Sequence, residues 1–383
     1  MSIGFSSSIE ARAYDNIKKG LMPGAAVSVI NEKGLIYENC FGVCDIEKRN
    51  PIEENSLFRL ASMTKPITAV ALLICEERGL LSIDDPVCKY LPSLSKMTIG
   101  DVDAEGKIIS RHEAKGVPTI KNILNHTGGL GQGFAGLNSF NEVFELKDGI
   151  RLCDAVPRFN EICLDFEPGT LCGYTTTLGF DCAAHIVEIV SGMDIEDFLK
   201  KELFDKLETN GLLYTPSEDD KNRTVTLYDT VGGALIKKDI TGCNFEPYPI
   251  SYKAAGCGML GSLSGYTAFV SMLLNGGVYN GSRILSEESV KKASTVSVPD
   301  NLNRFFPHEK WGLAMRVITD IVPGEQELPV GCYGWSGAYG CHFFIDPKRK
   351  LAAVFMKNVA NAGGATAPTA REFEADVLKD FYK

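Results

Sequence analysis

Two residues at the entrance of an apolar stretch could carry nucleophilic chemistry: Ser62 and Lys65. They are three positions apart, so on a helix both side chains lie on one face within reach of each other. Residues 67–75 are apolar nearly all round, which predicts a buried helix that begins close to Ser62 and ends at Gly79. A lysine at the entrance of a buried helix is costly unless it is paired or used. A serine beside such an amine is the pattern of a nucleophile with its base.

The spacing Ser-x-x-Lys occurs three times in the chain, and only the first copy opens an apolar helix. The copy at Ser93 follows a proline in a polar segment, and the copy at Ser289 sits beside two glutamates on an expected solvated helix. We assign no chemistry to those two copies. At Ser62 the positive end of the helix dipole could stabilise an alkoxide or an oxyanion. Spacing alone also allows a helix-capping Ser62 with an outward-reaching Lys65.

The composition is that of an ordinary soluble globular protein. The chain has 383 residues, 44% of them hydrophobic and 23% charged, which is enough for a large core and for two domains or subdomains. The formal net charge of -10 is spread along the chain and argues against a surface for nucleic acid or for anionic membranes. We find no signal peptide and no membrane-spanning stretch, so we expect a cytoplasmic protein whose 12 cysteines are mostly reduced thiols.

Other motifs that look functional fail in their context. Residues 131–136 match Gly-x-Gly-x-x-Gly, but they follow an expected helix rather than a strand, so we reject a dinucleotide site. Cys40 and Cys44 have no nearby histidine or second cysteine pair, so we expect no zinc site. His126 ends an expected helix, and we expect it to bond local backbone rather than to serve in a catalytic triad. The chain also lacks Gly-x-Ser-x-Gly, the nucleophile elbow of α/β-hydrolases.

Both ends of the chain carry a helix and a strand pair, and strand pairs need a shared sheet for stability. The simplest architecture is α+β, with one antiparallel β-sheet flanked by helices and a mostly helical inserted domain. We expect the N-terminal part of the α/β domain over 1–80, the helical domain over 81–284 and the C-terminal part of the α/β domain over 285–383. The expected elements of the two ends are helices at 6–19 and 370–382 and strands at 25–30, 35–43, 340–345 and 351–356.

The middle of the chain is expected to be mostly helical, with helices at 180–190, 194–206 and 264–274. Residues 93–117 are polar and lack periodicity, so they are expected to form a loop or small peripheral elements. Residues 215–253 are expected to be irregular for the same reason.

Five stretches match the motifs of one superfamily in order and spacing: Leu60–Lys65, Ile120–Leu130, Phe166–Thr170 with Tyr174, Ala255–Leu273 with Asn275–Gly277, and Gly334–Ala338. Over roughly residues 20–360 the chain resembles the serine β-lactamase and penicillin-binding-protein-like superfamily, in its class C β-lactamase-like and family VIII carboxylesterase branch. The resemblance implies the β-lactamase/transpeptidase-like fold. It places the last stretch at the third motif, which we expect on an edge strand, one strand before the end of the chain.

The resemblance also implies a role for each matching residue. Ser62 would be the nucleophile, Lys65 its base partner and Tyr174 the second member of the proton relay. The oxyanion hole would take the backbone N–H groups of Ser62 and Ala338. No metal and no cofactor are implied. The substrate-binding residues would be Trp335, Ser336, Gly337 and Thr176.

Two of these roles have a structural alternative that the sequence leaves open. Only the motif selects Tyr174 from 13 tyrosines, and it could instead be a core tyrosine with a bonded hydroxyl. Trp335 could be a core residue of its strand rather than a wall of the substrate pocket.

The chain departs from β-lactamases in two motifs. Thr176 stands where they have Asn, and Trp335 and Ser336 stand where they have Lys and Thr. That lysine pairs with the carboxylate of β-lactam substrates, and a tryptophan cannot supply the charge. The resemblance is therefore closer to family VIII carboxylesterases. We expect a serine hydrolase that cleaves small or medium acyl esters through an acyl-enzyme on Ser62.

Other functions stay open at this point. The same nucleophile could serve a D-amino-acid amidase or peptidase, an acyltransferase or a class C β-lactamase. A catalytically idle binding protein is a third possibility, which the intact Ser62, Lys65 and Tyr174 disfavour. The expected partner is a small-molecule acyl ester or amide, with neither nucleic acid nor membrane, and the sequence leaves the oligomeric state open.

Overall fold

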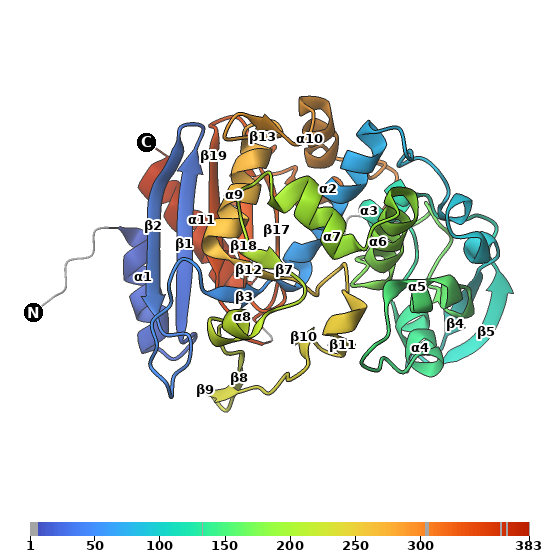
Figure 1. Cartoon of the computed structure of the whole chain (residues 1–383), viewed down its shortest axis with the longest axis horizontal. Coiled ribbons are helices and arrows are strands. Elements are labelled where there is room, and N and C mark those ends of the chain that lie inside the picture. Colours follow the sequence, from blue (N-terminus) through green and yellow to red (C-terminus); the bar gives the residue numbers. More distant parts are fainter. Residues whose placement is uncertain (1–6, 132, 303–305, 361, 365–366, 383) are drawn as a thin grey trace, which may run out of the picture.

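A seven-stranded antiparallel sheet takes strands from both ends of the chain, as expected (Figure 1). The computed structural model describes residues 7–131, 133–302, 306–360, 362–364 and 367–382. In spatial order the strands of the sheet are β15 (Glu309–Trp311), β16 (Arg316–Ile318), β17 (Tyr333–Ser336), β18 (His342–Asp346), β19 (Leu351–Met356), β1 (Gly24–Asn31) and β2 (Gly34–Gly42).

The pairing of β1 with β19 joins the two ends of the chain. These strands run antiparallel, with Ala26 opposite Met356. Along β1, Ala26 and Ile30 enter one core cluster, whereas Val27 and Val29 enter the cluster on the opposite face. Successive side chains of a strand point to opposite faces, so a strand covered on both faces needs the continuous apolar run found here. Both predicted hairpins of the sheet are confirmed.

Helices cover both faces of the sheet (Figure 1). On one face α1 (Ser8–Lys18) packs against α11 (Pro368–Phe381). On the other face α9 (Leu263–Leu274) packs on β1 and β19. The predicted buried helix is α2 (Thr64–Glu77), which packs against α6 (Leu178–Ser191). The expected start of the first helix at residue 6 lies outside the described residues.

The third-motif strand differs from the prediction. We expected it at the edge of the sheet, but β17 is the third strand from that edge, and two strands rather than one follow it in sequence. The reason is that β15 and β16 each contain only three residues, too few to show a period-two pattern. Because β16 pairs with β17 only at Tyr333 and Gly334, the end of β17 still extends beyond its neighbour.

The middle of the chain is rich in short elements. The expected helices at 180–190 and 264–274 are α6 and α9, and the expected helix at 194–206 is α7 followed by a π-helical stretch. Apart from short 3₁₀ turns, the remaining helices of the described residues are α3 (Ile120–Leu124), α4 (Phe134–Val143), α5 (Leu152–Ala155), α7 (Ile195–Leu199), its π-helical stretch (Lys200–Phe204), α8 (Glu218–Asn222) and α10 (Glu287–Ser294). The division of the chain at residues 80 and 284 stays a prediction.

Short strands also form in the two segments expected to be irregular. Residues 93–117 contain the hairpin β4 (Thr98–Val102) and β5 (Ile108–Glu113). In the second segment Gly232 and Gly233, both with positive φ, allow the tight turn between β8 (Tyr228–Val231) and β9 (Ala234–Lys237). The other short strands are β3 (Leu57–Arg59), β6 (Cys163–Leu164), β7 (Leu212–Leu213), β10 (Cys243–Phe245), β11 (Tyr248–Pro249), β12 (Leu260–Ser262), β13 (Val278–Tyr279) and β14 (Ser282–Arg283).

The hydropathy of the helices and the state of the cysteines can be read from the structure. None of the described helices has the length and hydropathy required to cross a bilayer. Each of the twelve cysteines is a free thiol, and most of them are buried, where cysteine packs as a small apolar residue.

Candidate active site

Ser62 lies in a short turn of 3₁₀ helix, Ala61–Met63, that leads from β3 into α2. The preceding Ala61 is buried and has a φ of +45°, a left-handed conformation that alanine rarely adopts. Strain of this kind persists only where the surroundings enforce it. Here the hydroxyl of Tyr266 donates to the carbonyl of Met63 at 3.0 Å, which fixes the turn from the side of α9. The nucleophile candidate therefore stands on a rigid, strained turn.

Lys65 is fully buried one turn further along the same helix face. Its Nζ lies 3.2 Å from the Oγ of Ser62, so the predicted contact between these residues is present. The same nitrogen lies 2.5 Å from the carbonyl oxygen of Thr176 and 2.8 Å from that of Gly256. A neutral amine has two hydrogens and one lone pair. A charged Lys65 donates to all three oxygens. Once neutral, with its two hydrogens on the carbonyls, it would turn its lone pair to the hydroxyl of Ser62, which is the arrangement a base requires.

Tyr174 lies beside this pair. The Nζ of Lys65 is 5.0 Å from the centre of the Tyr174 ring, and the indole N–H of Trp335 donates to the Tyr174 hydroxyl oxygen at 3.2 Å. The ring is stacked on Trp311, with 5.6 Å between ring centres and 17° between planes. A donor aimed at the phenolic oxygen stabilises negative charge there. The structure thus brings Ser62, Lys65 and Tyr174 together, and the relay role of Tyr174 stays a prediction.

His126 holds the Tyr174 segment from behind. Its Nδ1 accepts from the backbone N–H of Thr175 at 3.1 Å, and its carbonyl accepts from the N–H of Gly173 at 2.9 Å. Complete burial, and secondarily the nearby charge of Lys65, keeps the pKa of His126 well below its usual value. A neutral imidazole can accept the Thr175 N–H. His126 therefore bonds backbone as predicted, but the backbone of a distant segment, Gly173–Thr175, rather than that of its own helix end.

The proposed oxyanion donors are drawn together by a glycine. A Cβ at Gly337 would lie 2.2 Å from the carbonyl oxygen of Leu60, so only glycine lets the end of β17 approach the Ser62 turn this closely. The next residue, Ala338, is exposed, and its backbone N–H has no acceptor in the described part of the chain. An unsatisfied N–H beside the nucleophile is what an oxyanion hole needs. The oxyanion role of Ser62 and Ala338 stays a prediction.

The other copies of the Ser-x-x-Lys spacing lack this environment. Ser93 is exposed in a single 3₁₀ turn, Pro92–Ser95. In α10, Lys292 forms an ion pair with Glu76 at 2.9 Å and so does not serve Ser289. Both observations fit the prediction that these two serines carry no chemistry.

The family to which this arrangement belongs is decided by comparison with known proteins. A family model described as Beta-lactamase matches residues 11–376. This chain belongs to the β-lactamase family. Protein Rv1367c of Mycobacterium tuberculosis (strain ATCC 25618 / H37Rv) is 28% identical over 350 residues, covering 88% of this chain and 86% of the relative. Esterase EstB of Burkholderia gladioli is 26% identical over 367 residues, covering 91% of this chain and 88% of EstB.

Solved structures show the same fold. EstCE1, described as a hydrolase with promiscuous acyltransferase activity, has a TM-score of 0.77 at 20% identity and covers 95% of each chain. Simvastatin synthase (LovD) from Aspergillus terreus has a TM-score of 0.81 at 21% identity, covering 99% of this chain and 100% of LovD. The predicted β-lactamase/transpeptidase-like fold is confirmed. With the family and its esterase relative, the chain is a serine hydrolase of the β-lactamase-like superfamily.

In this β-lactamase-family site the third motif presents two side chains to opposite faces of β17. Trp335 is 4% exposed, and its ring centre lies 4.5 Å from that of Trp311 and 5.2 Å from that of Tyr174. It is therefore both a core residue and part of an aromatic wall beside Tyr174. The hydroxyl of Ser336 lies 2.7 Å from the Nδ1 of His342, on the other face of the strand. The substrate-binding roles of Trp335, Ser336 and Gly337 stay predictions.

Thr176 is exposed, and it contributes its backbone carbonyl to Lys65 rather than a buried side chain. In this position a threonine in place of asparagine leaves the Lys65 contact intact, because the main chain makes it. The substrate-binding role of the Thr176 side chain stays a prediction.

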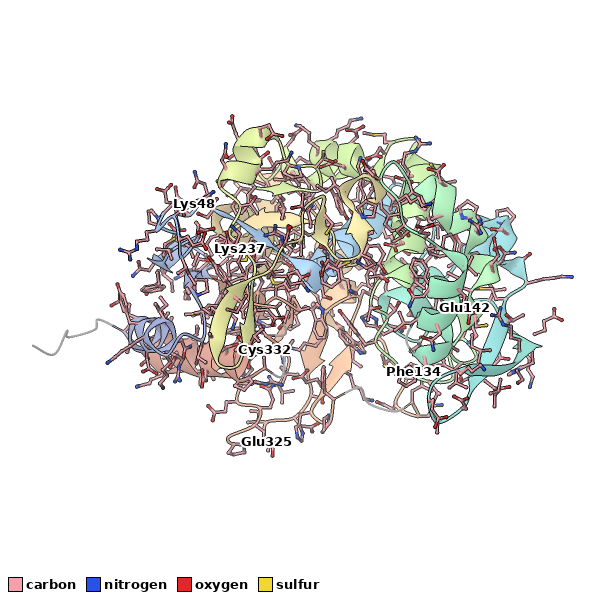
Figure 2. All side chains as sticks on the ribbon, turned by 90° about the horizontal axis from the view of Figure 1, so that it is seen from below. Lys48, Phe134, Glu142, Lys237, Glu325 and Cys332 are labelled. Atoms are coloured by element: carbon pink, nitrogen blue, oxygen red, sulfur yellow. The ribbon has the colours of Figure 1, made fainter. Side chains whose placement is uncertain are left out.

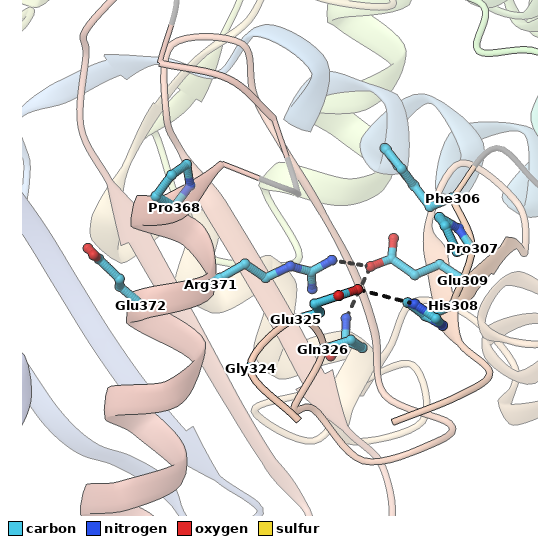
Figure 3. Close-up of a pocket in the computed structure, with 10 residues that line it drawn as sticks. All are labelled: Phe306, Pro307, His308, Glu309, Gly324, Glu325, Gln326, Pro368, Arg371 and Glu372. Carbon is cyan, nitrogen blue, oxygen red and sulfur yellow. Dashed lines mark hydrogen bonds and ion pairs between the residues drawn. The ribbon is translucent and has the colours of Figure 1, made fainter. Parts of the chain in front are cut away.

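A buried ionic network anchors β17 on the face of the sheet that α11 covers. His342 lies 3.1 Å from Glu374 of α11, and Glu374 pairs with Arg316. Burial raises the pKa of Glu374, but the charge of Arg316, the hydrogen bond and charge of His342 and the charge of Arg371 together outweigh it and lower the pKa to about 2. The network continues to Glu309, which also accepts from Arg371 and Gln326 at the wall of a cavity of about 500 Å³ (Figure 3). These pairs hold α11 against the sheet under the third motif.

The sequence analysis did not identify Trp311 or Asp181, and both contact the site through long-range packing. Only the rarity of tryptophan, with two in the chain, could have pointed to Trp311. Asp181 is fully buried on α6, where it accepts from the N–H of Ala255 at 2.9 Å and from the hydroxyl of Tyr252 at 3.1 Å. The residue after Ala255 is Gly256, whose carbonyl binds Lys65. Asp181 therefore positions an acceptor of Lys65.

Asp181 should also make stability depend on pH. Burial raises its pKa from 3.8 to about 7. A carboxyl whose folded pKa is raised stabilises the fold fully below its unfolded pKa and loses that contribution as pH rises through the folded value. The Asp181→Asn variant keeps an acceptor for Ala255 and a partner for Tyr252, so we expect it to gain up to roughly 4 kcal/mol relative to wild type between about pH 4 and 7. Urea unfolding at several pH values measures this difference.

Asp45 provides the matched control for that experiment. Burial opposes the ionisation of Asp45, but the backbone N–H of Lys48 and other donors lower its pKa to about 2. The contribution of Asp45 to the free energy of unfolding is therefore present above the pKa of the unfolded state and is lost as pH falls toward the lowered pKa of the folded state. Asp45→Asn should thus cost most stability at neutral pH. If the free energy of unfolding of wild type and that of Asp181→Asn changed with pH in the same way, the pKa of Asp181 would not be raised by folding, and the prediction would be wrong.

Proposed function

We propose that this serine hydrolase of the β-lactamase family is a carboxylesterase that cleaves small or medium acyl esters through an acyl-enzyme on Ser62. The observation that carries the proposal is the aromatic wall at the third motif. Trp335 and Trp311 both pack against Tyr174, so a buried aromatic cluster surrounds the position of Trp335, which the resemblance to β-lactamases assigns to a carboxylate-binding lysine. An apolar wall favours a neutral substrate by about 25 cal/mol per Å² of apolar surface buried.

In the proposed mechanism the phenolate of Tyr174, stabilised by Lys65, takes the proton of the Ser62 hydroxyl, and Oγ attacks the ester carbonyl carbon. The negative charge that develops on the carbonyl oxygen is stabilised by the backbone N–H groups of Ser62 and Ala338. The carbon–oxygen bond to the alcohol then breaks, and Tyr174 returns the proton to the departing alkoxide. Water repeats the sequence on the acyl-enzyme, which releases the carboxylic acid and regenerates Ser62.

A substrate panel tests this function. We expect the highest kcat/KM for p-nitrophenyl acetate or butyrate. Values should be lower by about 10² or more for D-amino-acid p-nitroanilides, which carry an ammonium, and for a chromogenic cephalosporin, which carries a carboxylate, because an unpaired charge beside apolar side chains costs several kcal/mol. A cephalosporin turned over as efficiently as the butyrate ester would instead make the chain a β-lactamase in activity.

Acyl transfer to an alcohol is the second candidate, since it shares the acyl-enzyme and differs only in the acceptor. The structural relative EstCE1 is described as having acyltransferase activity besides hydrolysis. An apolar wall beside the acyl group would favour an organic alcohol over water. Adding 1-butanol to the p-nitrophenyl butyrate reaction and measuring the ratio of butyl butyrate to butyrate distinguishes transfer from hydrolysis.

A further inference from the structure

A cavity of about 840 Å³ lies beside β3, at the residue three positions before Ser62. Its wall includes Arg59 of β3, a stretch before β8, and the segment from the end of β9 into β10. Figure 2 shows Lys237 where the β8–β9 hairpin returns to the body of the molecule. The ionisable side chains with a formal charge in the wall are four cations and one carboxylate: Arg59, Lys221, Lys237, Lys238 and Asp239.

Arg59 differs from the three lysines in having no carboxylate partner. Its Nη1 donates to the carbonyl of Val225 at 2.8 Å, while its Nε is enclosed without a hydrogen-bond partner. Within the described residues no carboxylate lies within ion-pair distance of this guanidinium. The lysines are paired with Glu218 at 2.6 Å, Asp45 at 3.3 Å and Glu246 at 2.7 Å, respectively.

An enclosed charge without a counterion is unfavourable, and burial accordingly lowers the pKa of Arg59. A guanidinium presents its donors as a planar fork that fits the two oxygens of a carboxylate or a phosphate. The lysines in the wall add positive potential to the same cavity, although their own partners screen part of it. The cavity therefore has the excess of cationic side chains expected of an anion site, and the guanidinium of Arg59 in its wall has no carboxylate partner among the described residues.

The cavity also adjoins the proposed oxyanion hole. Leu227 and Ile240 from its wall pack in one apolar cluster with Ala61 and Tyr339. Ala61 precedes Ser62, and Tyr339 follows Ala338. An anion bound at Arg59 would thus lie behind the side of the site where the carbonyl oxygen of a substrate is expected.

We propose that this cavity binds a carboxylate or phosphate group against the guanidinium of Arg59. The group belongs either to the far end of an ester substrate, which rests on the proposed esterase function, or to a free small anion. This anion site is distinct from the position of a β-lactam carboxylate, which lies close to the scissile bond and would face Trp335.

Binding is measured first without reference to activity. Inorganic phosphate is titrated by isothermal calorimetry at constant ionic strength, because salt screens exposed charges. We expect saturable binding to wild type and an affinity lower by about tenfold or more in Arg59→Gln, which loses charged hydrogen bonds. Arg283→Gln is the matched control, since Arg283 also donates to backbone carbonyls but lies outside the cavity wall. Its affinity for phosphate should equal that of wild type.

A second variant keeps the test valid if Arg59→Gln does not fold. Lys237 and Lys238 line the cavity, and replacing both with glutamine should weaken phosphate binding by roughly threefold through the loss of positive potential. No saturable binding by wild type, or equal affinity in wild type and Arg59→Gln, would overturn the proposal.

A kinetic arm identifies the source of the anion. The substrates are the mono-p-nitrophenyl ester of adipic acid and its methyl-capped, uncharged analogue. If the anion belongs to the substrate, phosphate competes with the acidic ester only, and Arg59→Gln raises KM for that ester alone. If phosphate binds without competing, the site serves a free anion. Should neither ester react, the esterase function fails while the calorimetric result on the anion site still stands.

Discussion

Replacing Lys65 with methionine is expected to lower kcat for p-nitrophenyl butyrate by about 10² to 10⁴, the range for a positioned acid–base group. The reason is geometric, because the Nζ of Lys65 is the nitrogen that lies 3.2 Å from the Oγ of Ser62. Tyr174→Phe removes only a hydroxyl and should lower kcat by a similar factor. The double variant should be little worse than either single one, since the two groups act as a unit.

Tyr228→Phe is the control for this relay. Its hydroxyl accepts from the backbone N–H of Ile46 at 2.8 Å, away from Ser62, so its loss should leave kcat unchanged while costing some stability. Circular dichroism establishes that each variant is folded before its rates are compared. Turnover by Tyr174→Phe close to that of wild type would mean that its phenol carries no proton in the reaction.

Replacing Trp335 with lysine is expected to change substrate preference more than any other single substitution in the site. The new charge would lie beside Tyr174, where it could pair with a carboxylate next to the scissile bond. A hydrogen bond to a charged group is worth about 1.5 to 3 kcal/mol, which corresponds to roughly 10- to 100-fold. The ratio of kcat/KM for a chromogenic cephalosporin to that for p-nitrophenyl butyrate should rise by this factor.

Ser336→Thr is the matched control for the specificity change. Because the Ser336 hydroxyl is bonded to His342 on the opposite face of β17, threonine alone should leave the ratio unchanged. Trp335→Ala should raise KM for bulky neutral esters more than for acetate esters, since a wall is lost rather than a charge gained. A preference for cephalosporin that is the same in wild type and Trp335→Lys would show that Trp335 does not contact the substrate.

The sequence predicts the parts of the fold that carry long regular patterns. The apolar run of α2 and the hairpins around 31–34 and 346–350 are clear, and the superfamily resemblance supports joining both ends in one sheet. The strands β15 and β16 could not be predicted, because three residues cannot establish a period. For the same reason the sequence assigned β17 to the edge of the sheet.

Site residues that are close in sequence could be predicted together, whereas those far apart in sequence could not. Ser62 and Lys65 are three residues apart, so a helix alone brings them together. Tyr174 was found only through its place in a motif, because its neighbours Lys65 and Trp335 are more than a hundred residues away. Trp311 and Asp181 reach the site in the same way but belong to no quoted motif. Their roles depend on packing that local patterns do not encode.

The central claim is that Ser62 forms the acyl-enzyme, and covalent labelling tests it most directly. A fluorophosphonate probe reacts with an activated serine hydroxyl, and mass spectrometry of the digested protein locates the adduct. We predict one adduct, on the peptide that contains Ser62, and none in Ser62→Ala. An adduct on Ser93 or Ser289 instead, or labelling of Ser62→Ala equal to that of wild type, would contradict the account.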